Sequence, residues 1–116
     1  MLTVATRRSL TIALAVCAAV ALSRPAAAQD AKKGEAVYTA QKCSLCHQIA
    51  GKGNKASPLD GVGAKLSADD IRQWITHPVE AAAKAKSTKK PPMPAKYSKL
   101  PAADLDALVA YMLSLK

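Results

Sequence analysis

The chain has 116 residues, which leaves room for one small domain only. Aromatic residues make up 3% of the sequence and phenylalanine is absent, so there is little bulk to fill a hydrophobic core. A domain of this kind commonly needs an added component to be stable. The formal net charge of +9 favours acidic partners or anionic membrane surfaces and indicates nothing about the fold.

The first 28 residues have the pattern of a secretory signal peptide. Arg7 and Arg8 form a basic start, residues 10–22 are apolar apart from Thr11, and three alanines end at Ala28. The apolar run is too short to span a bilayer as a helix. We therefore expect export, cleavage after Ala28, and a domain of residues 29–116. Three of the 17 basic residues and none of the eight acidic ones lie in the leader, so the domain would carry a net charge of +6.

The domain is predicted to begin with a helix. Asp30 can cap a helix that starts at Ala31, and Gly34, Val37 and Tyr38 would share one of its faces. The segment KCSLCH at 42–47 then falls at or just beyond the end of this helix. The next stretch, up to position 65, contains four glycines, an asparagine and a proline, and this composition predicts a loop.

A middle helix is predicted from the residues that follow the loop. Residues 67–70, SADD, form the pattern of a capping box, and Ile71, Trp74 and Ile75 come next at helical spacing. Pro78 should end this helix, because a proline disfavours helical dihedrals in the residue before it. The same proline can serve as the first residue of a further turn or two of helix.

The last part of the chain combines a stiff strap with a final helix. Residues 89–94, KKPPMP, cannot form a regular helix because their three prolines remove backbone donors and fix the backbone. After Pro101 the pattern is helical, and the apolar stripe consists of Leu105, Leu108, Val109, Met112 and Leu115. No stretch alternates like a strand, so we predict an all-α domain.

Cys43, Cys46 and His47 carry the strongest functional signal. On a helical segment they stand at i, i+3 and i+4 and project from one face. Two thiols on that face can add to the vinyl groups of a haem while the imidazole reaches its iron. A zinc site would lack a paired second motif, having only the remote His77 to add, and a thioredoxin-like dithiol would need a βαβ pattern. A disulfide, the third alternative, would leave the shortage of core bulk unexplained.

Across essentially the whole of residues 29–116, the chain resembles a class I c-type cytochrome, the small monohaem bacterial cytochrome c. The matching elements, in the order of that family, are GEAVY, CSLCH, a glycine-rich loop ending in SPLDG, a middle helix with Trp74, PPMP, and a final helix ALVAYMLSL. The resemblance implies an all-α cytochrome c fold, with three to five short helices packed around one covalently bound haem c.

The resemblance also implies roles for individual residues. Cys43 and Cys46 form thioethers to the haem, His47 is the proximal iron ligand, and Met93 is the distal ligand. His77 is an alternative distal ligand, which would lower the reduction potential relative to a methionine.

Two further residues match cofactor-binding positions of the family. The carbonyl of Pro58 would accept a hydrogen bond from the ring of the ligating histidine, or Pro58 would be an ordinary loop proline. Trp74 would pack on the haem, with its indole N–H near a propionate, or would be a plain core aromatic.

The family resemblance also predicts a crossing between the first and last helices. Gly34 and Tyr38 match the positions of the first helix at this crossing, with Leu108 and Tyr111 facing them. The spacing from Tyr38 to Cys43 is one residue longer than is usual in the family.

The function implied is that of a periplasmic one-electron carrier that is not an enzyme. The alternatives are a haem subunit of a larger periplasmic oxidoreductase and a ligand-binding or peroxidase-like protein with a displaceable Met93. We expect a monomer that binds acidic redox proteins, with possible peripheral contact to anionic membranes and no nucleic-acid partner. The binding face would be formed by lysines near the methionine strap, namely Lys84, Lys86, Lys89, Lys90, Lys96 and Lys99.

Overall fold

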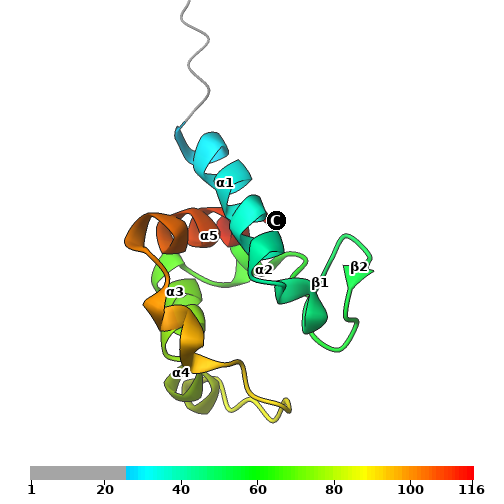
Figure 1. The fold of residues 1–116 in the computed structure, drawn as a ribbon. Helices are drawn as coiled ribbons and strands as arrows, with labels where there is room; N and C mark the ends of the chain where they lie inside the picture. The colour runs from blue at the N-terminus through cyan, green and yellow to red at the C-terminus, as the bar shows by residue number, and fades with distance from the viewer. Residues whose placement is uncertain (1–25) are drawn as a thin grey trace, which may run out of the picture.

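The computed structural model describes residues 26–116, so almost all of the expected signal peptide, with Arg7 and Arg8, lies outside the described residues. The described chain contains five α-helices, two short 3₁₀ helices and one two-stranded antiparallel sheet (Figure 1). In chain order the elements are α1 Ala26–Ala40, η1 Cys43–Leu45, β1 Gln48–Ile49, β2 Lys52–Gly53, α2 Val62–Lys65, α3 Ala68–Thr76, α4 Pro78–Lys84, η2 Ala95–Lys99 and α5 Ala102–Ser114.

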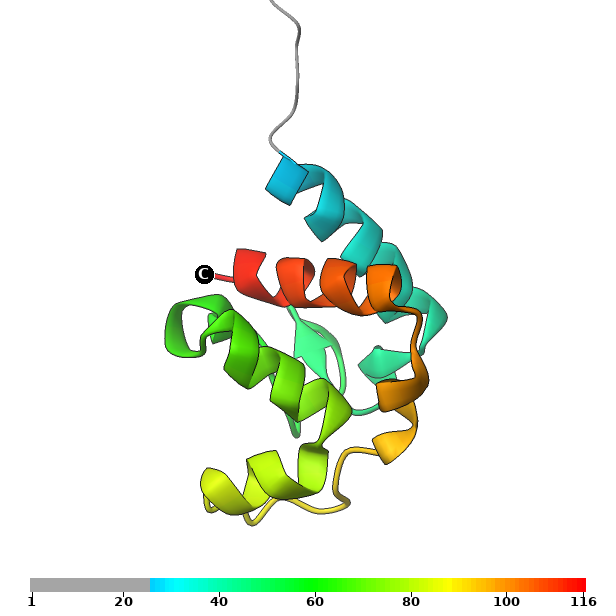
Figure 2. The same ribbon diagram turned by 90° about the vertical axis from the view of Figure 1, so that its left-hand side faces the viewer.

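The first and last helices cross and make the most extensive contact in the molecule (Figure 2). A Cβ atom added to Gly34 would lie 2.0 Å from the carbonyl oxygen of Ala107 and 2.6 Å from Cβ of Tyr111. Only glycine allows the two backbones to approach so closely. One turn further along α1, Tyr38 meets Tyr111 edge to face, with ring centroids 5.8 Å apart. The predicted crossing is therefore present, with Ala107 taking the place expected for Leu108 opposite Gly34.

The hydrophobic core joins α1, α3, η2 and α5. Ile71 is 3% exposed and Ala107 is 2% exposed, and the partly buried Cys43 and Met93 pack against the same core. The segments that contain Cys43 and Met93 therefore border the hydrophobic core. Its buried members are Val37, Tyr38, Ile71, Ile75, Tyr97, Leu108, Val109 and Met112.

The capping box at the start of α3 is confirmed. The Ser67 hydroxyl accepts a hydrogen bond from the Asp70 amide at 3.1 Å, and the Asp70 carboxylate accepts one from the Ser67 amide at 3.4 Å. The Ser67 hydroxyl also donates to the Asp70 carboxylate at 2.8 Å, and this bond, helped by the one from the Ser67 amide, holds the pKa of Asp70 below its usual value. The helix ends at Thr76, and Pro78 is the first residue of α4, as predicted.

Several boundaries differ from the sequence-based expectations. Helix α1 begins at Ala26 and not at Ala31, so Asp30 lies inside it and does not cap it, because the alanines before it are good helix formers. Cleavage after Ala28 stays a prediction. The 3₁₀ helix η2 was not expected between the strap and α5.

The predicted loop over 48–65 holds three short elements, namely β1, β2 and the four-residue helix α2, so the expectation of a loop without strands is wrong in detail. Ala50 and Gly51 both have positive φ, 51° and 79°, as a two-residue type I′ hairpin turn requires. The strands pair Ile49 with Lys52, and two residues are too few to show an alternating pattern. None of the helices in residues 26–116 is long and apolar enough to cross a membrane.

We expect Gly34→Ala to lower the free energy of unfolding by about 2 kcal/mol, because the new methyl group would overlap the Ala107 carbonyl. Guanidinium denaturation followed by circular dichroism would measure this loss. Glu35→Ala is the matched control, since Glu35 is exposed on the same helix and its replacement should change stability by less than about 0.5 kcal/mol. Equal stability of the two variants would contradict the close crossing.

Candidate functional site

The cysteine and histidine residues lie on a turn of their own, just after α1. Lys42 has a φ of 56°, in the left-handed region, and it separates this turn from the helix. The amides of Cys46 and His47 both donate to the Cys43 carbonyl, at 3.1 and 3.0 Å. The motif therefore keeps the helical spacing expected for it. Its turn, however, does not continue the axis of α1. Cys43 and Cys46 are free thiols, the first half-buried and the second exposed.

The imidazole of His47 is oriented by a backbone carbonyl. Its Nδ1 lies 3.1 Å from the carbonyl oxygen of Ser57, and an N–H at Nδ1 donating to that oxygen leaves the Nε2 lone pair available to a metal. Burial lowers the pKa of His47, and the positive charge of Lys89 lowers it further, against the opposing effect of the Ser57 hydrogen bond. The ring is thus kept in the neutral form that binds metals.

The prediction that Pro58 supplies this carbonyl is wrong by one residue. Ser57 is the acceptor, and its carbonyl also receives the Gln48 amide at 3.2 Å. Pro58 still contributes, because a proline restricts the residue before it to extended conformations. It thereby helps to fix the direction of the Ser57 carbonyl, and it forms a parallel bridge with Gln48.

Asn54 and Gly53 hold the loop against the motif, a role that the sequence alone did not assign. The side-chain amide of Asn54 donates to the Leu45 carbonyl at 3.0 Å. The backbone amide of Asn54 donates to the His47 carbonyl at 2.9 Å. A Cβ on Gly53, which has a φ of 105°, would lie 2.1 Å from the His47 carbonyl oxygen. The glycines and asparagine of this loop were visible in the sequence, but their partners were not.

Met93 lies in the strap, residues 89–94. The strap is part of the segment 85–94 between α4 and η2, which forms no helix or strand. It is half-buried and packs against the same hydrophobic core as Cys43. A thioether and a thiol from segments far apart in the sequence thus meet the same apolar surface, which is a suitable arrangement for a flat apolar group with a metal at its centre.

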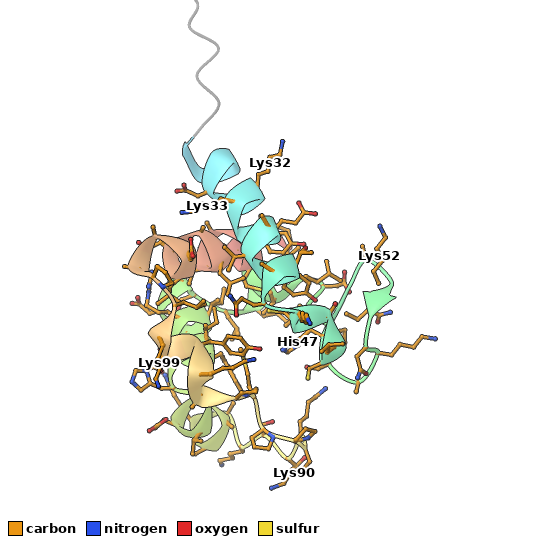
Figure 3. All side chains as sticks on the ribbon, viewed as in Figure 1. Lys32, Lys33, His47, Lys52, Lys90 and Lys99 are labelled. Carbon is orange, nitrogen blue, oxygen red and sulfur yellow. The ribbon has the colours of Figure 1, made fainter. Side chains whose placement is uncertain are left out.

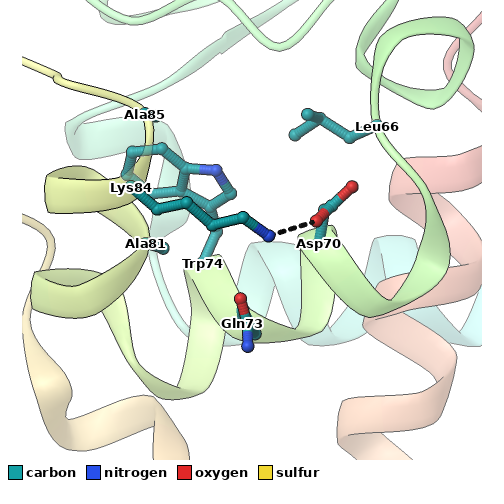
Figure 4. Close-up of a pocket in the computed structure, with 7 residues that line it drawn as sticks. All are labelled: Leu66, Asp70, Gln73, Trp74, Ala81, Lys84 and Ala85. Atoms are coloured by element: carbon teal, nitrogen blue, oxygen red, sulfur yellow. Dashed lines mark ion pairs between the residues drawn. The ribbon is translucent and has the colours of Figure 1, made fainter.

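Trp74 is half-buried and lies outside the core cluster. It lines a cavity of about 290 Å³ between α3 and α4 (Figure 4). Lys84 and Asp70 form an ion pair of 3.6 Å beside it, with Leu66 on the far side. Trp74 therefore borders a cavity in this structure, and both interpretations of it, contact with a haem and a plain core aromatic, stay predictions.

The Tyr38 hydroxyl is buried and has no hydrogen-bond partner among the described residues. Burial raises its pKa to about 12. Burial also raises the pKa of the Cys43 thiol, and the two groups lie near enough to influence each other electrostatically. A buried hydroxyl without a partner fits a domain in which a further polar group arrives with a cofactor.

The side chains present fit a covalently attached haem. The turn offers two thiols and an imidazole with a free nitrogen, and the strap offers a thioether sulfur. No large side chain in the described residues is fully buried, in keeping with a core that needs an added apolar component. Within residues 26–116, no three His, Cys, Asp or Glu side chains converge as the ligands of a zinc site would.

A small helical domain with this turn, this strap and this core belongs to the class of proteins that bind haem through thioethers. The family model described as Cytochrome c matches residues 31–116, so the chain belongs to the cytochrome c family. The expected fold is confirmed, and covalently bound haem c with its iron is the cofactor. Comparisons with curated proteins and with solved structures gave no match. Family membership carries haem-based electron transfer as the general function.

Tyr38→Phe is expected to flatten the loss of stability at alkaline pH. Unfolded Tyr38 ionises near pH 10, whereas the folded residue holds its proton up to about pH 12. The stabilisation is fully present below pH 10 and is lost as the pH rises to 12. Guanidinium unfolding at pH 9 to 12 should show a steeper loss for the wild type than for Tyr38→Phe. Parallel profiles would contradict the burial of this hydroxyl.

Proposed function

We propose that the protein is a periplasmic one-electron carrier whose haem c is attached through Cys43 and Cys46 and ligated by His47 and Met93. The observation that carries this proposal is the hydrogen bond between His47 Nδ1 and the Ser57 carbonyl. A histidine held in this way presents Nε2 in one tautomer and one orientation, as an iron ligand requires. The periplasmic location is inferred from the signal-peptide pattern.

The roles of the protein side chains follow from the site. Haem, when bound, supplies an iron that accepts and releases one electron. His47 is oriented by Ser57 and kept neutral, and Met93 offers a sulfur that raises the reduction potential relative to a second histidine. If His47 and Met93 both held the iron, no coordination position would be left for a substrate, and this would favour a carrier over an enzyme. Trp74 is proposed to contact the haem from its cavity.

The ligand set can be tested by visible spectroscopy of the protein made in cells that attach haem. We expect sharp c-type bands on reduction, and a weak red band of sulfur-to-iron charge transfer in the ferric form. Met93→Leu should lose the red band and lower the reduction potential, because the sulfur ligand is removed. Met112→Leu is the matched control, since Met112 is a buried core residue of α5 and should leave the band in place.

Three outcomes would contradict the proposal. A wild-type protein without covalent haem would exclude the roles of Cys43 and Cys46. A high-spin ferric spectrum with rapid binding of carbon monoxide by the reduced protein would instead support the ligand-binding or peroxidase-like alternative. Co-purification in a stable complex would support a subunit of a larger oxidoreductase.

We further propose that acidic redox proteins dock on the lysines of the strap and η2. All six lysines predicted for this face are exposed. Lys84 is engaged in the ion pair with Asp70, and Lys96 lies over the ring of Tyr97 at 5.2 Å. The Lys89 ammonium donates a hydrogen bond to the Ala56 carbonyl. Lys90, by contrast, makes no ion pair or side-chain hydrogen bond within residues 26–116, and neither do Lys86 and Lys99.

Lys90 and Lys99, two of these lysines without a bonded partner in the described residues, lie on a different part of the surface from Lys32 and Lys52. Figure 3 shows Lys90 at the lower end of the molecule and Lys99 at the end of η2, whereas Lys32 is near the top of α1 and Lys52 on the hairpin. This separation allows the local charge near the strap to be changed independently of the total charge. A monomer with peripheral contact to anionic membranes remains part of the proposal.

Lys90→Glu/Lys99→Glu should slow oxidation of the ferrous protein by ferricyanide, an anion, about threefold more at low salt than Lys32→Glu/Lys52→Glu does. Both double variants change the net charge equally, so the difference reports the position of the charge. Stopped-flow kinetics at several salt concentrations would measure it, and added salt should reduce it. Equal slowing by both variants would show that these lysines only make the surface soluble.

A further inference from the structure

A single long side chain joins the strap with Met93 to the loop that orients His47. The Lys89 ammonium donates a hydrogen bond of 2.7 Å to the Ala56 carbonyl, across 33 positions of sequence. Ala56 directly precedes Ser57, whose carbonyl holds the His47 ring. In Figure 1 the strap extends from α4 toward the segment that follows β2. The contact therefore bridges the two halves of the candidate site.

Few other hydrogen bonds hold the segment between α4 and η2. Lys86 and Ser87 donate their amides back to α4, and the Lys89 amide lies 3.4 Å from the Ser87 hydroxyl. Among the hydrogen bonds of residues 26–116, the one from the Lys89 ammonium alone ties residues 88–93 to a distant segment. Pro91, Pro92 and Pro94 have no amide N–H, which leaves few backbone donors here to bind another segment.

We propose that Lys89 is a positioning residue that restrains Met93 on the iron by tying its strap to the histidine-side loop. This inference rests on the proposed ligation by His47 and Met93. A haem held by His47 and Met93 would be bound by both segments, and the Lys89 side chain joins these segments directly. For an outside ligand to replace Met93, the strap must move away, and this movement breaks the bond to Ala56. The positive charge of Lys89 is thus a structural tie as well as part of the basic surface.

The size of the effect follows from the chemistry of the contact. A hydrogen bond with a charged donor is stronger than one between neutral groups, but exposure to water weakens it. Lys89 is exposed, so its loss should act on the opening of the strap and leave the α1–α5 core almost untouched. A local opening that becomes easier by about tenfold corresponds to about 1.4 kcal/mol.

The test is the rate at which imidazole displaces the sulfur ligand from the ferric haem protein, followed by loss of the red charge-transfer band. We expect Lys89→Ala to react about tenfold faster than the wild type. Lys89→Arg retains a charged donor and should react within about threefold of the wild type. Lys99→Ala removes an equal charge from an exposed lysine without such a bond, and should match the wild-type rate.

Global unfolding in guanidinium, measured in parallel, separates positioning from general stability. Faster displacement with an unfolding midpoint equal to that of Lys99→Ala would support the tie. A displacement rate in Lys89→Ala equal to that of the wild type would overturn the proposal. A faster rate would also overturn it if the unfolding midpoint fell enough for the loss of global stability to explain the faster displacement. If the wild-type protein has no red band, the proposed ligation itself has failed.

A measurement on the unchanged protein keeps the inference testable if the alanine variant does not accumulate. Brief acetylation of the wild-type haem protein, read by mass spectrometry, should modify the Lys89 amine about fivefold more slowly than the Lys99 amine, because a donated hydrogen bond protects it. Equal acetylation of the two amines would overturn the proposal.

Discussion

The close crossing of α1 and α5 is the contact on which the rest of the structure depends. Without a side chain at Gly34, the two helices approach until backbone meets backbone at Ala107. This contact joins the two ends of the domain and places Tyr38 against Tyr111. The attachment turn follows α1 after Lys42, and its Cys43 packs against the core to which both helices contribute.

A second constraint acts around the turn, where the loop supplies partners that no helix provides. Asn54 binds the carbonyls of the motif, and Ser57 binds the imidazole, so the short hairpin and the extended segment at Pro58 both serve His47. The glycine-rich composition predicted only a loop. The structure shows that this loop supports the turn that carries His47.

Local patterns allowed much of this to be predicted from the sequence. The capping box at Ser67, the break at Pro78 and the apolar stripe of α5 each depend on neighbours within a few positions, and all three are confirmed. The helical spacing of the cysteine motif also holds, although Lys42 turns it away from α1. The carbonyl that orients His47 was misplaced by one residue, because it depends on the pairing of Gln48 with a segment ten residues away. The cavity beside Trp74 depends on how α4 folds back onto α3, which no local pattern encodes.

The left-handed residue Lys42 has a consequence for how this domain tolerates changes in length. In one continuous helix, an inserted residue would rotate everything after it by about 100° and carry the thiols away from the core. Here a single residue with φ of 56° resets the direction of the chain between α1 and the turn. The turn is then fixed by its own hydrogen bonds and by Asn54, whatever the phase of the preceding helix. A residue inserted between Tyr38 and Cys43 would therefore be accommodated at Lys42, without displacing the helical crossing or the attachment turn.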